Sequence, residues 1–450
     1  MGYIVKVKKL SRKNVYSNSL PPLENYKTIK LIGLCLNIYT FFSFGSFVRR
    51  YGGIMEKLAE NILSWCKNLE PAAMQQVQNL SKHPCLVGNV CLMPDAHCGY
   101  GMPIGGVVAL DNAISPNMVG VDIGCGMLAV QTSLTAIEHD KVKAIVDKIY
   151  ERIPLGFEHH KEAQENPIFL DMARWNKTEV CKREFFAAQK QIGTLGGGNH
   201  FIEVQAGDDG HIWFMIHSGS RNLGKQVAEF YNQKAVKLCK MYKQDVVAAQ
   251  DLAFLPIGSY EAGRYINEMK LCLDFAFENR KAIAEAIKKI FTEEFAQITF
   301  EKEINIHHNY AAIEEHYGRK VWVHRKGATL ARENTIGIIP GSQGTSSYIV
   351  QGLGNATSLQ SCSHGAGRCM SRSKAIRELN LAAEQDILNR QGIVHRMNER
   401  DLLDEAPSAY KNIDEVMQAQ KDLVKILVKL SPLGVVKALA EPPSWRKKGK

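Results

Sequence analysis

Five short polar motifs carry residues whose side chains bind metal ions or act as nucleophiles. Histidine, cysteine and aspartate together provide the nitrogen, sulfur and oxygen ligands of reactive transition-metal centres. Glycine beside such a residue lets the backbone come close to an ion or a substrate. The motifs are Val121-Asp122-Ile123-Gly124-Cys125-Gly126, Gly193-Thr194-Leu195-Gly196-Gly197-Gly198-Asn199-His200-Phe201-Ile202-Glu203, Ile216-His217-Ser218-Gly219-Ser220-Arg221, His307-His308-Asn309 and Ser363-His364-Gly365-Ala366-Gly367-Arg368. The pattern predicts an open metal centre rather than a packed core.

One carboxylate, one thiolate and three imidazoles are the expected metal ligands. Asp122 and Cys125 are separated by a short turn around Gly124, which lets both side chains face one ion or bridge two. This number of ligands exceeds the usual four of a closed structural zinc site, so two ions sharing the thiolate are one interpretation. Thiolate and imidazole suit Zn, Mn, Fe or Co, and a carboxylate shifts the preference toward harder ions such as Mn. The predicted ligands are Asp122, Cys125, His200, His217 and His308.

Two alternatives apply to this ligand set. The histidines could be ordinary polar residues in loops, although their clustering with glycine, asparagine and an Asp/Cys pair weakens that interpretation. Cys98, in the sequence His97-Cys98-Gly99, lies near Asp95 and could supply the thiolate in place of Cys125.

His364 differs from the other histidines in its neighbours. Gly365-Ala366-Gly367 leaves room for a large substrate, and Arg368 and Arg372 follow at spacings of four residues. An exposed imidazole beside guanidinium groups can attack phosphorus, and the resulting bond is labile enough to pass the group on. Arginine also binds phosphate through two hydrogen bonds at once. We therefore expect His364 to be a nucleophile, with a fourth metal-binding histidine as the alternative.

A phosphate-binding loop is a further alternative, carried by Gly219-Ser220-Arg221-Asn222-Leu223-Gly224-Lys225-Gln226. The segment nearly matches the G-x-x-x-x-G-K-[ST] pattern but lacks the final hydroxyl residue that would bind Mg²⁺. His217 just upstream favours a metal site instead.

The motifs are expected at strand ends and in loops of an α+β (mixed α/β) fold. Apolar periodicity and Gly/Pro/Asp punctuation are the signals used for each element. Helices are predicted over 55–82, 136–152, 162–191, 224–300 with a break near Pro256, 373–400 and 412–430, and strands within 86–132 and at 201–204, 212–216, 320–324 and 335–340. The simplest architecture is a single large domain with a central glycine-lined metal cleft.

Charge is concentrated at the two ends of the chain. The net charge of +10 comes from residues 1–54, which hold nine Lys/Arg and one acid, and from four Lys/Arg in the last six residues, leaving residues 55–444 at −2. We expect a 54-residue N-terminal extension without fixed structure, a catalytic domain over 55–438 and a basic tail over 439–450. Leu31–Val48 is uncharged, and a membrane or targeting element or a structured arm are the alternatives for the extension.

The cysteines predict a reducing compartment. Their number, 11, is odd and no C-x-x-C pair occurs, which argues against a disulfide framework. Free thiols fit the cytoplasm, where one thiolate can serve as a metal ligand.

Seven segments occur in an order that points to one enzyme family. They are Met93–Gly106, Val121–Gly126, Gly196–Phe201, His217–Arg221, His308–Asn309, Pro340–Thr345 and His364–Arg368. Together they resemble the RtcB family of RNA ligases, and the resemblance runs from about Met55 to Lys437.

The resemblance implies a GTP- and Mn²⁺-dependent ligase for tRNA splicing or RNA repair. Such enzymes join RNA ending in a 3′-phosphate or a 2′,3′-cyclic phosphate to RNA beginning with a 5′-hydroxyl. It implies a cytoplasmic monomer without DNA or membrane partners, and leaves open an activating protein partner. A dimetal phosphohydrolase that opens cyclic phosphates without ligation, and an inactive RNA-binding relative, are the alternatives.

The resemblance also assigns roles to residues. The five predicted ligands would hold two manganese ions with Cys125 bridging, His364 would carry GMP, and Asp95 would orient His364. The carboxylate of Glu203 would accept hydrogen bonds from guanine, which adenine cannot offer. The nucleotide-binding positions are Asn199, Phe201, Glu203, Ser342, Ser347, Ala366, Gly367, Tyr410 and Lys437, and the RNA-phosphate positions are Arg221, Lys326, Arg368 and Arg372.

Overall fold

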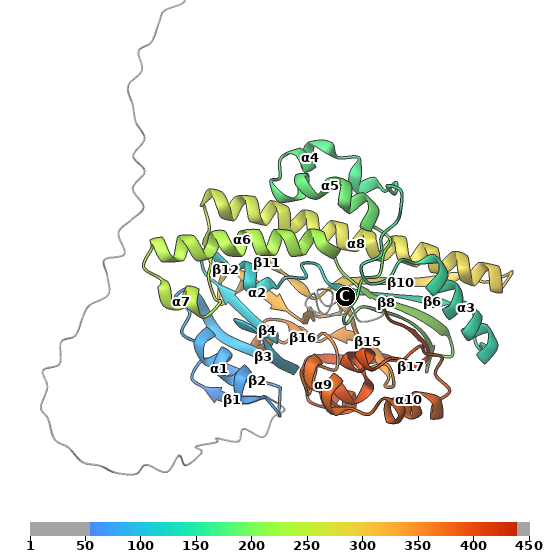
Figure 1. Cartoon of the computed structure of the whole chain (residues 1–450). Coiled ribbons are helices and arrows are strands. Elements are labelled where there is room, and N and C mark those ends of the chain that lie inside the picture. Colours follow the sequence, from blue (N-terminus) through green and yellow to red (C-terminus); the bar gives the residue numbers. More distant parts are fainter. Residues whose placement is uncertain (1–54, 439–450) are drawn as a thin grey trace, which may run out of the picture. The chain divides into compact units, whose positions relative to one another are not determined.

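Two large β-sheets form the framework of the computed structural model, which describes residues 55–438 (Figure 1). The fold is mixed α/β and forms a single domain, as predicted. The expectations for residues 1–54, including Leu31–Val48, and for residues 439–450 lie outside the described residues.

The six-stranded sheet carries the N-terminal part of the cleft. Its order is β1-β2-β3-β4-β12-β11, with only β2 and β3 parallel. Alternate residues of the central strand β4 pack into different hydrophobic clusters on the two faces of the sheet. Val107 and Ala109 lie on one face, and Val108 and Leu110 lie on the other. Both faces are therefore covered. The strands are β1 (Glu56–Ala59), β2 (Ile62–Ser64), β3 (Leu86–Tyr100), β4 (Met102–Leu110), β12 (Arg319–Lys326) and β11 (Asn309–His316).

The seven-stranded sheet is antiparallel and strongly curved. Its order is β10-β6-β8-β7-β17-β15-β14, and its edge strand β14 approaches β10 and β6. The run Ile212–Ser218 is buried throughout, as expected for a strand covered on both faces. The strands are β10 (Phe300–His307), β6 (Gly126–Thr132), β8 (Ile212–Ser218), β7 (Phe201–Gly207), β17 (Val424–Val436), β15 (Ser347–Gly352) and β14 (Ile336–Ile339).

Two short sheets complete the strands. β13 (Ala328–Leu330) pairs with β16 (Ser361–Ser363), and β5 (Ala113–Ile114) pairs with β9 (Leu255–Pro256). β16 ends directly before His364, so this pairing sets where that residue leaves the sheet.

Helices cover the outside of the sheets. The two longest, α6 and α8, lie side by side; α5 packs against both, and α4 packs against α5 (Figure 1). α3 and α8 cover the convex face of the curved sheet through residues such as Ile145 and Ile287. The helices are α1 (Pro71–Leu80), α2 (Pro116–Val119), α3 (His139–Arg152), α4 (Met172–Asn176), α5 (Val180–Gln191), α6 (Arg221–Met241), α7 (Asp245–Ala249), α8 (Tyr260–Glu294), α9 (Arg372–Glu378), α10 (Leu381–Arg390) and α11 (Ile413–Gln418), with 3₁₀ turns η1 (Pro167–Phe169), η2 (Ala356–Ser358), η3 (Arg400–Glu405) and η4 (Pro407–Ala409).

The helices predicted over 55–82 are confirmed only at α1, because residues 56–64 form the β1–β2 hairpin. Leu63 and Trp65 pack into one core cluster while Ile62 packs into another. This alternation belongs to a strand between two packed layers, whereas an amphipathic helix would bury only one face.

The helix predicted over 412–430 is half wrong. α11 occupies its start, but Val424–Val436 is a strand paired with both β15 and β7. The run Val424-Lys425-Ile426-Leu427-Val428 is rich in β-branched residues, which favour a central strand. The long helices predicted over 162–191 and 373–400 are broken into shorter helices, the latter at Asn380, whose side chain caps α10.

The strands predicted at 201–204, 212–216, 320–324 and 335–340 are confirmed, as is the interrupted helical region 224–300. Within the described part of the chain, no helix has the length and apolar character needed to cross a bilayer.

Candidate active site

A cavity of about 660 Å³ lies where strand ends from both large sheets meet. Its wall also contains glycine from several loops, including Gly120, Gly327 and Gly341. Most of the residues predicted from the sequence line it: Asp122, Cys125, Asn199, Phe201, Glu203, His217, His308, Lys326, Ser342, His364, Ala366, Gly367, Arg368, Arg372, Tyr410 and Lys437. A central, glycine-lined cleft is therefore present.

Four predicted residues lie behind this wall. They are Asp95, His200, Ser347 and Arg221. The first two contact wall residues directly, as described below. Gln205 donates hydrogen bonds to both Glu203 and Ser347, so the serine hydroxyl is linked to the wall through that amide. Arg221 donates to Thr194 Oγ1 at 3.0 Å and to Gly156 O at 2.8 Å.

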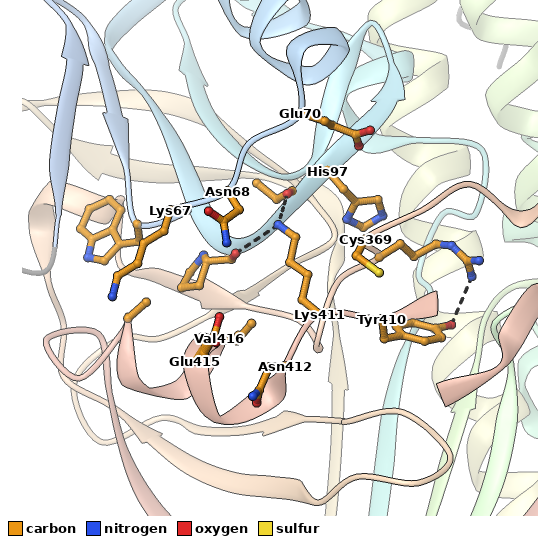
Figure 2. A pocket seen from close by; sticks show the side chains of 15 residues that line it. Lys67, Asn68, Glu70, His97, Cys369, Tyr410, Lys411, Asn412, Glu415 and Val416 are labelled. Carbon is orange, nitrogen blue, oxygen red and sulfur yellow. Dashed lines mark hydrogen bonds between the residues drawn. The ribbon is translucent and has the colours of Figure 1, made fainter. Parts of the chain in front are cut away.

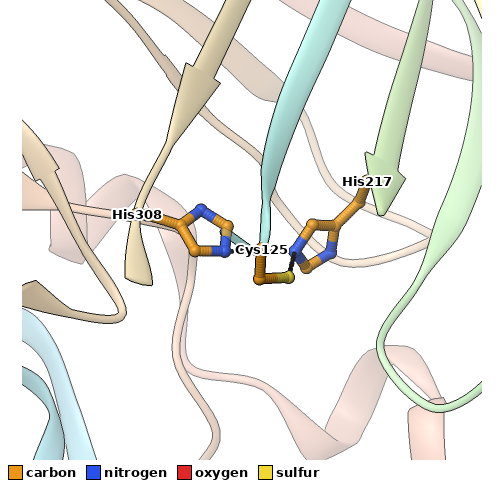
Figure 3. A group of neighbouring side chains, drawn as sticks. All are labelled: Cys125, His217 and His308. Carbon is orange, nitrogen blue, oxygen red and sulfur yellow. Dashed lines mark hydrogen bonds between the residues drawn. The ribbon is translucent and has the colours of Figure 1, made fainter. Parts of the chain in front are cut away.

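Cys125, His217 and His308 form the first group of side chains that could hold a metal ion (Figure 3). The Sγ of Cys125 lies 3.1 Å from Nε2 of His217, which lies 3.3 Å from Nε2 of His308. Ligand atoms bound about 2.1 Å from one ion in a tetrahedral shell are about 3.4 Å apart. The spacing therefore fits ligand atoms that share an ion.

Asp122, Cys125 and His200 form the second group. Nε2 of His200 lies 3.0 Å from Oδ2 of Asp122 and 3.5 Å from Sγ of Cys125. Cys125 belongs to both groups, which is the arrangement expected for a thiolate shared by two ions.

Hydrogen bonds to the far side of two rings fix which nitrogen faces the cavity. Nδ1 of His200 lies 2.9 Å from the Leu195 carbonyl, and Nδ1 of His217 lies 3.0 Å from the Asn199 carbonyl. A carbonyl only accepts, so each Nδ1 carries a proton and Nε2 is the nitrogen available to a metal ion. Nitrogen, sulfur and oxygen atoms that converge in this way are the ligands of transition-metal centres, so the donor set fits a metal ion. Among the described residues, Nδ1 of buried His308 has no hydrogen-bond partner.

His217, His308 and Asp122 are held in the protonation states that suit metal binding, and the Cys125 thiol is the exception. Loss of water lowers the pKa of His217 and of His308 well below the ordinary value, which keeps both rings neutral. For Asp122, burial acts to raise the pKa, but the hydrogen bond to His200 and nearby positive charge hold it below its usual value. Burial and then Asp122 raise the pKa of the Cys125 thiol, so thiolate formation at this site needs a bound cation.

Two buried polar residues of α8 hold the loops of the candidate metal ligands in place, and sequence reasoning missed both. Asn279 accepts from the Gly193 amide at 2.8 Å and donates to Gly219 O at 3.1 Å. Arg280 donates to the carbonyls of Gly124 and Ser218, each at 2.9 Å. The available signal was an Asn-Arg pair between apolar residues on the buried face of a long helix.

Gly196 is required by close packing at the same loops. Its φ is +94°, and an added Cβ would lie 2.6 Å from Nδ1 of His200 and 2.1 Å from the Arg221 guanidinium. A side chain at this position would displace the ring of His200, a candidate metal ligand.

His364 and Asp95 form a hydrogen-bonded pair beside the metal-binding groups. Nδ1 of His364 lies 2.6 Å from Oδ2 of Asp95, and that oxygen also accepts from the backbone amides of His364 at 3.0 Å and Gly365 at 3.3 Å. Asp95 is fully buried in β3, while the His364 side chain is 15% exposed. The His364 ring centroid lies 4.9 Å from that of His308. The carboxylate therefore holds a proton on Nδ1, so in the neutral ring Nε2 is the nitrogen that carries the free lone pair.

The backbone around this pair is locked by two contacts. Gly367 has a φ of +73°, and a Cβ there would lie 2.2 Å from the Asp95 carbonyl. Lys411 donates from Nζ to Ala96 O at 2.6 Å and from its backbone amide to Gly367 O at 2.9 Å. Lys411 thus ties the strand of Asp95 to the loop of His364, a role the sequence did not reveal.

A second cavity of about 370 Å³ adjoins the first, and Lys411 lines it (Figure 2). Figure 2 shows the Lys411 ammonium directed at the carbonyls on both sides of Asp95. His97, Arg368 and Tyr410 line both cavities.

Glu203 is a buried carboxyl group at the predicted guanine position. Burial raises its pKa to about 8, although the positive charge of Lys437 and a hydrogen bond from Gln205 oppose the shift. The Lys437 ammonium lies 5.7 Å from the Phe201 ring centroid. These three predicted nucleotide contacts therefore share one side of the cavity.

Lys326 is buried in the cavity wall, whereas Arg221 is half-buried behind that wall. Lys326 donates to Tyr100 O at 2.6 Å and to Asn117 O at 3.0 Å, and burial lowers its pKa to about 7. Arg221 begins α6 with a φ of +57°, a conformation rare for residues other than glycine. Its bonds to Thr194 and Gly156 hold it there.

Neither local alternative is supported by the geometry. Cys98 is exposed and lies outside both metal-binding groups of the described residues. Gly224 and Lys225 lie inside α6, and the Lys225 ammonium is 3.9 Å from Glu229, so this segment forms no phosphate-binding loop.

Known proteins of one family match this chain over most of its length. A family model described as tRNA-splicing ligase RtcB matches residues 76–184 and 170–438. The RNA-splicing ligase RtcB of Escherichia coli (strain K12) is 38% identical over 397 residues, covering 83% of this chain and 96% of that protein. The tRNA-splicing ligase RtcB of Pyrobaculum aerophilum is 33% identical over 77% of this chain and 87% of its own length, and the RNA-splicing ligase RtcB of Mycobacterium bovis is 32% identical over 80% and 100%.

Proposed function

Because the chain belongs to the RtcB family of tRNA-splicing ligases, we propose that it joins RNA ends in tRNA splicing or RNA repair. The proposed substrates are RNA with a 3′-phosphate or 2′,3′-cyclic phosphate, RNA with a 5′-hydroxyl, and GTP. Residues 55–438 are proposed as the catalytic domain. The free cysteines among the described residues support the cytoplasm as its location. We further propose that the protein is a monomer and that a protein partner activates it.

The observation that carries this proposal is the Asp95–His364 pair beside two metal-binding groups. His364 has one nitrogen committed to a buried carboxylate and the other free, in a cavity wide enough for a nucleotide. A hydrolase acting through metal ions alone would not need this second histidine site.

The metal-binding residues would hold two Mn²⁺ ions. Asp122, Cys125 and His200 form one proposed ligand group and Cys125, His217 and His308 the other. Bound ions would neutralise the triphosphate and the RNA phosphate.

His364 is the proposed nucleophile in the first step. Its Nε2 forms a bond to the α-phosphorus of GTP, the bond to the bridging oxygen breaks, and pyrophosphate leaves. The ring gains positive charge as the bond forms, and the Asp95 carboxylate at 2.6 Å stabilises it without taking the Nδ1 proton.

Transfer to RNA then regenerates the histidine. An oxygen of the RNA 3′-phosphate attacks the GMP phosphorus, and the electrons of the N–P bond return to Nε2. The 5′-hydroxyl oxygen next attacks the RNA phosphorus, GMP leaves with its oxygen, and the hydroxyl proton passes to water. A cyclic phosphate first consumes one water to give the 3′-phosphate.

Guanine would be selected by Glu203. Its carboxylate can accept from both N1–H and N2–H₂ of guanine, whereas adenine presents an unprotonated N1. Phe201, Ser342, Tyr410 and Lys437 line the same cavity, with Ser347 behind Glu203. Asn199, Ala366 and Gly367 also line it, as proposed phosphate and ribose contacts. The proposed RNA-phosphate contacts are Arg221, Lys326, Arg368 and Arg372.

Incubation with GTP labelled at the α-phosphate, in Mn²⁺, tests the proposal. The wild-type protein should form an acid-labile protein–GMP adduct that His364→Ala abolishes. A wild-type protein that opens cyclic phosphate but forms no adduct would instead be a dimetal phosphohydrolase.

A further inference from the structure

Glu405 is a buried carboxylate at the end of η3 that the family-based assignments do not include. It is 3% exposed and lines the main cavity. Four cavity residues are bound to it: Arg368, Arg372, Tyr410 and Lys437. It is the common partner of side chains from segments that are far apart in the sequence.

The two oxygens of Glu405 have different partners. Oε1 lies 3.0 Å from Nη1 of Arg368 and 3.2 Å from Nε of Arg372. Oε2 accepts from the Tyr410 hydroxyl and lies 3.2 Å from Nζ of Lys437. In the proposed function, Oε1 therefore binds the RNA-phosphate contacts and Oε2 binds the guanine contacts.

We propose that Glu405 is a positioning residue that couples guanine-nucleotide binding to RNA-phosphate binding, an inference that rests on the function proposed above. A carboxylate is planar and rigid, so a change at one oxygen reorients the other. Loss of a partner on the nucleotide side would therefore disturb the RNA side, and the reverse.

Charge supports this role for Glu405. Burial acts to raise its pKa, but the positive charges of Lys437, Arg372 and Arg368 outweigh burial and lower the pKa to about 2. The group is therefore ionised throughout the working pH range. Three cations around one carboxylate leave excess positive charge, which remains available to phosphate anions.

Packing around Arg368 limits how far the cluster can rearrange. Arg368 donates to Asp404 O at 2.5 Å and to Met370 O at 3.0 Å, and its guanidinium lies 5.1 Å from the Tyr410 ring centroid. Arg372 is half exposed, by contrast, so it can be replaced with little effect on folding.

Glu268 provides a matched control. It is a fully buried carboxylate that accepts from the Tyr231 hydroxyl at 2.7 Å and from the backbone amides at the start of α5, in a core outside the cavity wall. Glu268→Gln removes the same charge from the protein interior without touching the cavity.

The experiment measures two concentration dependences in the full-length protein with Mn²⁺. The first is the GTP concentration that half-saturates adduct formation without RNA. The second is the RNA concentration that half-saturates ligation by preformed adduct. Glu405→Gln should raise both about 10-fold or more, the loss expected for hydrogen bonds to a buried charge. Glu268→Gln should leave both within about twofold of wild type, the range expected of a site that touches neither substrate.

Arg372→Gln keeps the test decisive if Glu405→Gln fails to fold. Because Arg372 is bound to Oε1 of Glu405, the proposed coupling predicts a raised GTP requirement in Arg372→Gln even in the absence of RNA. An unchanged GTP requirement in Arg372→Gln, or equal effects of Glu405→Gln and Glu268→Gln, would overturn the inference. Absence of any adduct in the wild-type protein would instead refute the proposed function.

Discussion

Replacing Asp95 with Asn tests the role of the buried carboxylate beside His364. The change keeps the size of the side chain but removes a charge that lies 2.6 Å from Nδ1 of His364 and accepts two backbone amides. Two unit charges about 4 Å apart interact by about 4 kcal/mol at an effective dielectric constant near 20. Each 1.4 kcal/mol changes a rate about tenfold, so losing this stabilisation of the imidazolium should slow adduct formation about 1000-fold.

The assay is a single-turnover measurement of protein–GMP formation by rapid quench with α-labelled GTP. Thermal unfolding of Asp95→Asn should accompany it, because Asp95 also accepts bonds from the backbone of the His364 loop. A variant that folds like wild type and forms the adduct within about tenfold of the wild-type rate would refute the electrostatic role assigned to Asp95, since a lost charge pair predicts far more.

Three further predictions concern metal binding and pH. Cys125→Ser should lower the manganese content of the purified protein from about two ions to one or none, as measured by elemental analysis, because the thiol belongs to both ligand groups; retention of both ions would contradict sharing. Glu203 has a pKa of about 8 and is protonated at neutral pH, so the GTP concentration that half-saturates adduct formation should fall as pH rises toward 8. Glu203→Gln should flatten that pH profile, and an unchanged profile would rule out Glu203 as the titrating group. Lys326 has a pKa of about 7, so its contribution to RNA binding should weaken as pH rises above 7. If RNA binding by Lys326→Met depends on pH in the same way as binding by the wild type, Lys326 is not an RNA contact.

Local chemistry in the sequence predicted the cavity wall well. Asp122, Cys125 and His364 lie in tight glycine-rich turns at strand ends, and such turns are recognisable from a few neighbouring residues. The order of the motifs along the chain also predicted that residues far apart in the sequence, such as Glu203 and Lys437, belong to one site. The fold brings both to one cavity.

The residues that position this wall could not be predicted in the same way. Arg280, Lys411 and Glu405 act through contacts with segments more than 25 residues away in sequence, such as Lys411 with Ala96 and Glu405 with Arg368. Nothing near them in the chain marks these partners, because the contacts arise only when the sheets pack together.

The secondary-structure errors have a related cause. Residues 56–64 alternate polar and apolar residues in an order that resembles an amphipathic helix, and Lys425 and Lys429 are four residues apart, yet both segments pair as strands. Pairing with neighbouring strands overrode the local helical pattern in each case.

Mapping the site of GMP attachment is the most direct test of whether His364 is the nucleophile that takes GMP from GTP. The protein is incubated with GTP and Mn²⁺, digested at neutral or alkaline pH to preserve a phosphoramidate, and analysed by tandem mass spectrometry. The account predicts one GMP on the peptide that contains His364, and none in His364→Ala. GMP attached to a lysine or to any other histidine, or no attached GMP at all, would contradict it.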